Sequence, residues 1–151
     1  MNINETLKHY FGYDSLRPGQ QELIEGILQR KDVLGIMPTG AGKSLCYQVP
    51  ALMLDGITIV VSPLISLMTD QVKALNQAGV HAAYINSSLT ENQIRTALFY
   101  AAQGRYKIIY VAPERLNTIR FLEFACQVDI SMVTVDEAHC ICLLYTSDAA
   151  D

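Results

Sequence analysis

Short apolar segments alternate along this chain with longer segments in which apolar residues recur at helical spacing. The apolar segments are rich in Val and Ile, which is typical of strands buried on both faces of a parallel sheet. They cover residues 33–37, 57–62, 82–86, 107–112 and 132–137. Because the intervening segments are long enough for crossover helices, the pattern predicts an α/β fold with a mainly parallel sheet flanked by helices.

Several residues mark where the predicted helices begin and end. Ser62, which precedes a proline, is expected to be an N-cap, and Gly79 is expected to end the same helix. Thr90 and Gln93 have the spacing of a capping box. A further helix is expected to begin near residues 42–44, and Pro50 is expected to kink it or end it early.

The composition is that of one globular domain. The chain has 151 residues, of which 50% are hydrophobic and 17% charged, and its formal net charge is −4. A domain commonly holds about 100–200 residues. The hydrophobic fraction excludes a disordered tail, and the acidic balance excludes a strongly basic nucleic-acid footprint. A local patch or backbone amides can still bind phosphates.

The sequence predicts a cytoplasmic protein without a membrane partner. No stretch reaches the roughly 18–20 uninterrupted apolar residues of a membrane helix. The first residues contain neither the basic region nor the apolar region of a signal peptide. The cysteines are therefore expected to be reduced thiols.

A structural zinc site is disfavoured. His139, Cys140 and Cys142 are too closely spaced in the sequence, and no second pair of ligands follows them.

A phosphate-binding loop is expected where the apolar segment 33–37 runs into the sequence PTGAGKS. Glycines allow the backbone N–H groups to point at phosphate oxygens, and the following helix N-terminus favours an anion. Lys43 is expected to reach the β- and γ-phosphates, and the Ser44 hydroxyl to ligate Mg²⁺. The strict Walker A pattern has Gly where this chain has Met37; the alternative is a glycine-rich turn with an exposed lysine. The expected nucleotide-binding residues here are Thr39, Gly40, Ala41, Gly42, Lys43 and Ser44.

Two carboxylates follow the last apolar segment. Asp136 and Glu137 are expected at the carboxyl edge of a buried strand, which is where ligands bind in open α/β sheets. Asp136 would hold Mg²⁺ through water, and Glu137 would deprotonate the attacking water. With Lys43 they form the expected catalytic set. The alternative is an acidic pair that ends a strand or caps a helix. A small-molecule kinase is disfavoured, because a residue that activates water, such as Glu137 beside Asp136, suits hydrolysis.

With these residues in place, the chain resembles the first RecA-like domain of RecQ-family DNA helicases. The resemblance covers about residues 5–141 and rests on five segments in order. They resemble the family's adenine-recognition motif and its motifs I, Ia, Ib and II, at residues 11–21, 37–48, 62–72, 110–116 and 136–141.

The resemblance implies an ATP-binding domain of the RecA-like P-loop NTPase type with ATP and Mg²⁺ as its cofactors. It places Tyr13, Arg17 and Gln20 around the adenine. Each side chain is chemically suited to this place. The Tyr13 ring can stack on a purine, the Arg17 guanidinium can lie across or beside the ring, and the Gln20 amide can form two hydrogen bonds with adenine. The alternative for Tyr13 and Phe11 is packing in the core of the first helix.

The resemblance also implies DNA as the partner. The segment from Ser62 to Ser66 and that from Pro113 to Arg115 are expected to bind the backbone of single-stranded or partly duplex DNA. The parent protein is then an ATP-dependent DNA helicase that moves 3′ to 5′. RNA helicases share the same core and remain an alternative, as does a nucleotide-binding module without helicase activity.

The last residues are expected to differ from the rest. Residues 1–142 are interpreted as the truncated domain and residues 143–151 as a foreign or unstructured tail, because the family continues motif II with an aromatic-rich loop that this chain lacks. The fold would then be incomplete at its C-terminus. The second RecA-like domain, with its arginine finger, is also missing, so the isolated chain is expected to bind ATP with negligible turnover.

Overall fold

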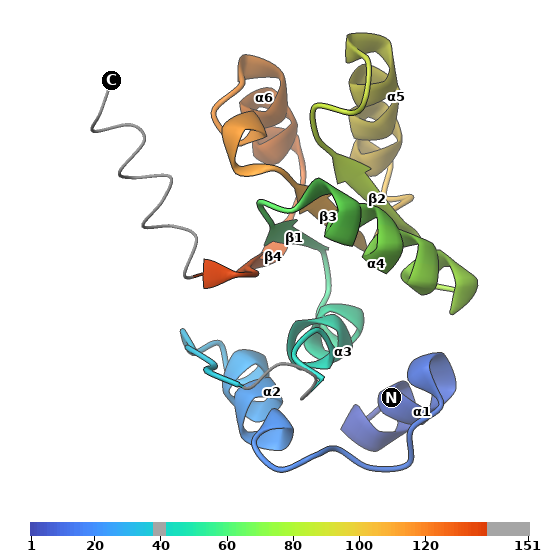
Figure 1. Ribbon diagram of the computed structural model, residues 1–151, viewed down its shortest axis with the longest axis vertical. Coiled ribbons are helices and arrows are strands. Elements are labelled where there is room, and N and C mark those ends of the chain that lie inside the picture. Colours follow the sequence, from blue (N-terminus) through green and yellow to red (C-terminus); the bar gives the residue numbers. More distant parts are fainter. Residues whose placement is uncertain (38–41, 139–151) are drawn as a thin grey trace.

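The fold is built on a parallel sheet between two helical layers (Figure 1). The computed structural model describes residues 1–37 and 42–138. Within them the sheet has four strands in the order β2-β3-β1-β4, and every neighbouring pair is parallel, which confirms the predicted α/β class. The strands are β1 (Ile57–Val61), β2 (Ala82–Ile85), β3 (Ile108–Val111) and β4 (Ile130–Val135).

The carboxyl ends of the strands are level with one another. Val61 at the end of β1 pairs with Val111 of β3 on one side and with Val135 of β4 on the other. The residues that follow these strands therefore meet at one edge. Ser62, Ala112 and Asp136 are the first of them.

Each face of the sheet is covered by two helices (Figure 1). One face packs against α3 (Leu45–Met53) and α4 (Ile65–Gln77), with Val60, Met68 and Tyr110 in the shared core. The other face packs against α5 (Glu91–Ala102) and α6 (Ile119–Gln127). A short 3₁₀ helix, η1 (Pro113–Arg115), connects β3 to α6.

Two N-terminal helices form a further layer on α3. These are α1 (Ile3–Phe11) and α2 (Gln20–Leu28). Leu7 of α1, Ile24 of α2 and Val49 of α3 are all completely buried where the three helices meet. This contact brings the N-terminal residues to the helix that follows the predicted phosphate loop.

The capping signals were informative to different degrees. The capping box of Thr90 and Gln93 is present at the start of α5, and Gly79, with φ +90°, follows the end of α4, so both predictions are confirmed. The N-cap prediction for Ser62 is wrong, because α4 begins at Ile65 after Leu64. Ser62 is buried instead, and its hydroxyl accepts a hydrogen bond from the Leu64 N–H at 3.5 Å.

The prediction that Pro50 ends the helix early is also wrong. Helix α3 continues through Pro50 to Met53, and the Leu54 N–H donates to the Pro50 carbonyl at 2.9 Å. A proline removes one backbone hydrogen bond from a helix. Here its neighbours Val49 and Ala51 are completely buried, so packing stabilises the last turn.

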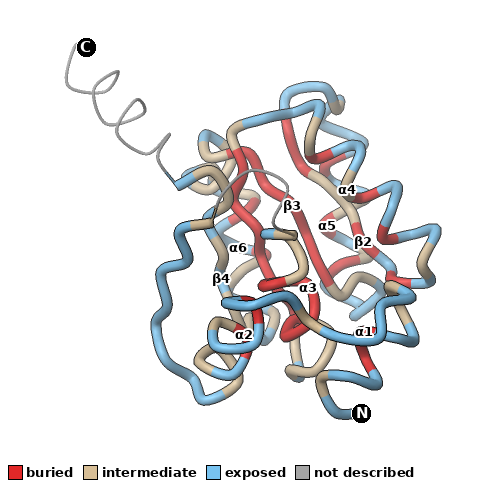
Figure 2. Tube along the Cα trace, turned by 60° about the horizontal axis from the view of Figure 1, so that its bottom comes forward, coloured by how far each residue is buried: buried red, intermediate tan, exposed pale blue. Residues whose placement is uncertain are grey.

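The strand predicted at residues 33–37 is absent from the described part of the chain. These residues are extended and mostly exposed, in the pale blue segment after α2 (Figure 2). They lie against α2: a Cβ on Gly26 would come within 2.8 Å of the Val33 side chain. A run of apolar residues predicts burial but does not identify the strand with which it would pair. No strand of the described sheet pairs with this segment.

Strand β4 begins two residues earlier than predicted and forms one border of the described sheet. Its alternate residues Val133 and Val135 are exposed, Val133 by 61%. The predicted tail at residues 143–151 lies outside the described residues. Among the residues that the structure places, no helix is long and apolar enough to cross a membrane.

Candidate nucleotide site

A cavity of about 590 Å³ opens at the carboxyl edge of the sheet. Its walls come from the segment between α1 and α2, the start of α3, helix α4 and the residues after β4. It is lined by Tyr13, Ser15, Arg17, Gln20, Gly42, Lys43, Ser44, Leu45, Leu67, Gln71, Asp136 and Glu137. The structure therefore brings all the described site residues of the sequence analysis to one cavity.

Lys43 and Glu137 meet across this cavity. The Lys43 Nζ lies 3.9 Å from Glu137 Oε1, although the two residues are far apart in the sequence. Lys43 lies two residues before α3, and Glu137 lies two residues after β4 in a left-handed conformation with φ 55°. Such a backbone conformation is uncommon for a residue with a side chain and recurs at functional sites. The opposite charges of the two side chains attract each other at this distance.

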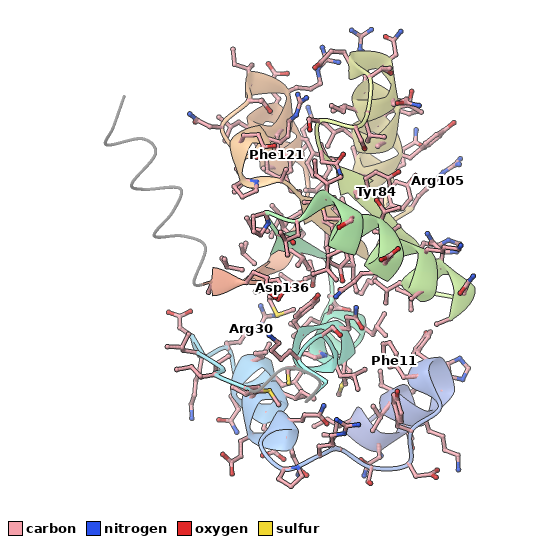
Figure 3. All side chains as sticks on the ribbon, viewed as in Figure 1. Phe11, Arg30, Tyr84, Arg105, Phe121 and Asp136 are labelled. Carbon is pink, nitrogen blue, oxygen red and sulfur yellow. The ribbon has the colours of Figure 1, made fainter. Side chains whose placement is uncertain are left out.

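Asp136 is held by the backbone on both sides. Its N–H donates to the Val61 carbonyl at 2.9 Å, which continues the β1–β4 ladder by one residue. Its Oδ1 accepts from the Glu137 N–H at 2.9 Å, and its Oδ2 faces the Tyr47 hydroxyl at 3.4 Å. Figure 3 shows Asp136 at the end of β4, between the sheet and α3.

The residues at this end of the cavity suit a magnesium ion that is bound mainly through phosphate and water. They offer the Ser44 hydroxyl and the two carboxylates, all of them hard oxygen ligands. The Ser44 side chain makes no capping hydrogen bond to α3. In the described ranges, 1–37 and 42–138, no group of three His, Cys, Asp or Glu side chains could hold a metal without such help.

Gly42 lines the part of the cavity where the sequence predicts phosphate binding. Its φ is +74°, and its carbonyl accepts from the Gln20 Nε2 at 3.0 Å. A Cβ at this position would lie 2.4 Å from the same nitrogen, so the close approach requires glycine. The other predicted loop residues, Thr39, Gly40 and Ala41, lie outside the described residues.

The three predicted adenine-contacting residues line the same cavity as Gly42. Tyr13 is 55% exposed, so core packing does not explain it, whereas Phe11 packs in the core as the alternative stated. Gln20 is buried, and its Oε1 accepts from the Arg17 N–H at 2.7 Å. Each side-chain group of Gln20 therefore has a partner in this state, and its contact with adenine stays a prediction.

The two segments predicted to bind DNA lie at the same edge of the sheet. Leu64, Ile65 and Ser66 are exposed at the start of α4, while Ser62 is buried. Arg115 forms an ion pair with Glu91 at 3.3 Å. Residues 64–66 and Glu114 are thus the exposed parts of the two segments, and DNA binding by either segment stays a prediction.

Sequence reasoning missed four polar residues beneath the cavity. They are Tyr47, Gln48, Gln71 and Tyr110, and their side chains form one hydrogen-bonded group. Burial raises the pKa of Tyr47 well above its ordinary range and that of Tyr110 to about 12. All four residues lie in the segments 37–48, 62–72 and 110–116 that carry the family resemblance, but the sequence analysis gave none of them a role, because no spacing rule connects residues of two helices and a strand.

Comparison with known proteins gives a family. The DEAD/DEAH box helicase family matches residues 17–146. The ATP-dependent DNA helicase RecQ of Bacillus subtilis (strain 168) is 52% identical over 136 residues, which is 89% of this chain and 23% of that protein. The RecQ helicase of Haemophilus influenzae is 47% identical over 90% of this chain and 22% of that protein. The chain thus spans less than a quarter of the length of these relatives.

A solved structure supports the fold. The crystal structure of the DUF1998 helicase MrfA bound to DNA and AMPPNP matches with a TM-score of 0.72 and 18% identity, over 91% of this chain and 20% of that one. At this identity the match shows the fold alone, and the expected RecA-like fold is confirmed. The family match covers most of the chain: it belongs to the DEAD/DEAH box helicase family, and within that family it resembles the RecQ DNA helicases.

Proposed function

We propose that the cavity binds ATP with Mg²⁺ and that this chain is the ATP-binding part of a DNA helicase. The observation that carries the proposal is the convergence of Lys43, Asp136 and Glu137 on one cavity, with the Lys43 ammonium 3.9 Å from a Glu137 oxygen. These groups come from positions far apart in the sequence, and an ion pair at an open cavity contributes little to stability, so stability alone does not explain their meeting.

Each residue has a role that its position permits. Lys43 and the amides around Gly42 neutralise and orient the phosphates at the start of α3. Ser44 and Asp136 hold the magnesium ion, which when bound supplies charge neutralisation on the phosphate oxygens. Glu137 leaves Lys43 and accepts a proton from the attacking water. Tyr13, Arg17 and Gln20 hold the adenine.

DNA is the proposed partner, and the direction of movement is 3′ to 5′. The support is the similarity to RecQ DNA helicases and the exposed surface at residues 64–66, beside the cavity. Unwinding requires two domains that close around ATP and open again. The proposed activity therefore belongs to a protein of the relatives' length, and the chain by itself binds ATP with negligible turnover.

The first test is ATP binding by this chain. Lys43→Ala is expected to weaken ATP binding in Mg²⁺ by at least about tenfold, because a charged hydrogen bond contributes about 1.5–3 kcal/mol. Isothermal titration calorimetry measures the affinity. Lys73→Ala, an exposed lysine on α4, is the matched control and should bind as the wild type does. Unchanged affinity in Lys43→Ala would remove the phosphate-binding role.

The partner is tested on a protein that continues to the length of the helicase relatives. Its ATP hydrolysis is expected to rise when single-stranded DNA is added. Stimulation by RNA alone would replace DNA with RNA as the proposed partner.

A further inference from the structure

A buried polar cluster lies directly beneath the nucleotide cavity. It consists of Tyr47 and Gln48 of α3, Gln71 of α4 and Tyr110 of β3. Tyr47, Gln48 and Tyr110 are at least nine-tenths buried, and Gln71 is half-buried and lines the cavity. Burying three polar side chains is unfavourable unless they are hydrogen-bonded. None of them is needed for the phosphate contacts proposed above, so their arrangement calls for its own explanation.

Both tyrosines of this cluster are hydrogen-bonded to Gln71. The Tyr110 hydroxyl donates to Gln71 Oε1 at 2.6 Å, and the Tyr47 hydroxyl donates to the same oxygen at 2.7 Å. Gln48 Nε2 donates to the Tyr110 hydroxyl at 3.1 Å. Tyr47 also faces Asp136 Oδ2 at 3.4 Å. The Tyr47 hydroxyl thus stands between an acceptor on α4 and the carboxylate proposed to hold Mg²⁺.

The hydroxyl hydrogens of the two tyrosines allow two hydrogen-bonding arrangements of the cluster. A phenol has a single hydrogen to donate. In the first arrangement both tyrosines donate to Gln71, as their short distances indicate, and Asp136 receives nothing from Tyr47. In the second, Gln48 donates to Tyr110, Tyr110 to Tyr47 across their 3.1 Å contact, and Tyr47 to Asp136. The position of the Gln71 side-chain carbonyl decides between them.

We infer that Tyr47 and Gln71 are positioning residues for Asp136, and that they connect this carboxylate to helix α4. When α4 holds the Gln71 oxygen against the tyrosines, Tyr47 does not donate to Asp136; when Gln71 moves away, Tyr47 donates to it. The inference rests on the proposed function, because it assumes that Asp136 holds Mg²⁺. A partner bound at the exposed residues 64–66 could then regulate the site through α4, because these residues lie at the start of that helix.

The test measures how strongly Mg²⁺ improves ATP binding by this chain. The ATP affinity is determined by calorimetry in excess Mg²⁺ and in EDTA, and the ratio of the two affinities is the metal-dependent factor. The variants are Tyr47→Phe, Gln71→Met and the double variant. Tyr84→Phe on β2 and Gln77→Met at the end of α4 are matched controls. Thermal unfolding shows that each variant is folded.

The inference assigns the second arrangement to the state with Mg²⁺ bound. Tyr47→Phe is therefore expected to lower the metal-dependent factor by roughly threefold to tenfold, the effect of losing one hydrogen bond, while the affinity in EDTA stays unchanged. Gln71→Met is expected to change the factor in the wild-type background but not in the Tyr47→Phe background, because its effect passes through the Tyr47 hydroxyl. Such non-additivity is what coupled residues show. The two controls should keep the wild-type factor.

Several outcomes would overturn the inference. An unchanged metal-dependent factor in both Tyr47→Phe and Gln71→Met would do so. Additive effects of the two substitutions on this factor would also do so. An equal loss of ATP affinity in Mg²⁺ and in EDTA would show that the substitutions act through packing alone. If Tyr47→Phe does not fold, an unchanged factor in Gln71→Met overturns it. A wild-type chain that binds ATP equally with and without Mg²⁺ would contradict the proposed function itself, and the inference would fall with it.

Discussion

At the scale of single residues, the site depends on polar groups that are held before any ligand arrives. Asp136 is fixed by backbone hydrogen bonds to Val61 and Glu137, and Lys43 is paired with Glu137. In the proposed function, ATP exchanges the Lys43–Glu137 contact for Lys43–phosphate contacts and releases the carboxylate of Glu137.

The buried tyrosines predict a loss of stability at high pH. Burial raises the pKa of Tyr110 from 10.0 to about 12, so between these values the unfolded chain loses the phenol proton while the folded chain keeps it. The free energy of unfolding is therefore expected to fall as pH rises, by about 1.4 kcal/mol per pH unit from this residue. Urea unfolding from pH 9 to 11.5 should show a shallower fall in Tyr110→Phe. Parallel curves for the two proteins would contradict the prediction.

At the scale of helices and strands, local signals succeeded where the interaction itself is local. The capping box of Thr90 and Gln93 and the glycine after α4 involve residues within one turn, and both are present. The segment 33–37 was misassigned because its apolar residues do not say which strand would pair with them. Pro50 was misassigned because the burial of α3 comes from α1, α2 and the sheet, which its own sequence does not reveal.

The capping box gives a prediction at this scale. In Thr90→Ala the Gln93 N–H loses its bond to the threonine hydroxyl, which is 3.2 Å long. The free energy of unfolding is expected to fall by about 1 kcal/mol. Urea denaturation measures the change. Thr96→Ala, in the middle of the same helix, is the control and should leave stability within about 0.5 kcal/mol. Equal effects of the two substitutions would show that the cap does not stabilise α5.

At the scale of the whole molecule, the cavity could be predicted and the buried cluster beneath it could not. The parallel sheet brings strand ends to one edge, so carboxylates after a strand and a lysine before a helix were expected to meet there. Tyr47, Gln71 and Tyr110 come from three elements whose relative placement only the tertiary structure provides. Their connection to Asp136 was therefore invisible to the sequence patterns.

The exposed border of the sheet predicts association of this chain with itself. Val133 and Val135 of β4 and Leu34 and Ile36 of the segment before the loop are all exposed. An apolar edge strand is a template for pairing with another chain. Gel filtration with light scattering should show larger species as concentration rises, and Val133→Lys should remain monomeric. Leu122→Lys, an equal change of charge on α6, should associate as the wild type does; a wild-type chain that stays monomeric throughout would refute the prediction.

The central claim is that the lysine before α3 and the acids after β4 bind the same nucleotide and ion. Nuclear magnetic resonance of the chain with ATP and Mn²⁺ tests it most directly, because the paramagnetic ion broadens only nearby signals. The amide signals of Lys43, Ser44, Asp136 and Glu137 are expected to broaden together, while those of His81 and Tyr106, which line a separate cavity, persist. Broadening at only one of the two segments, or at His81 and Tyr106 instead, would contradict the account.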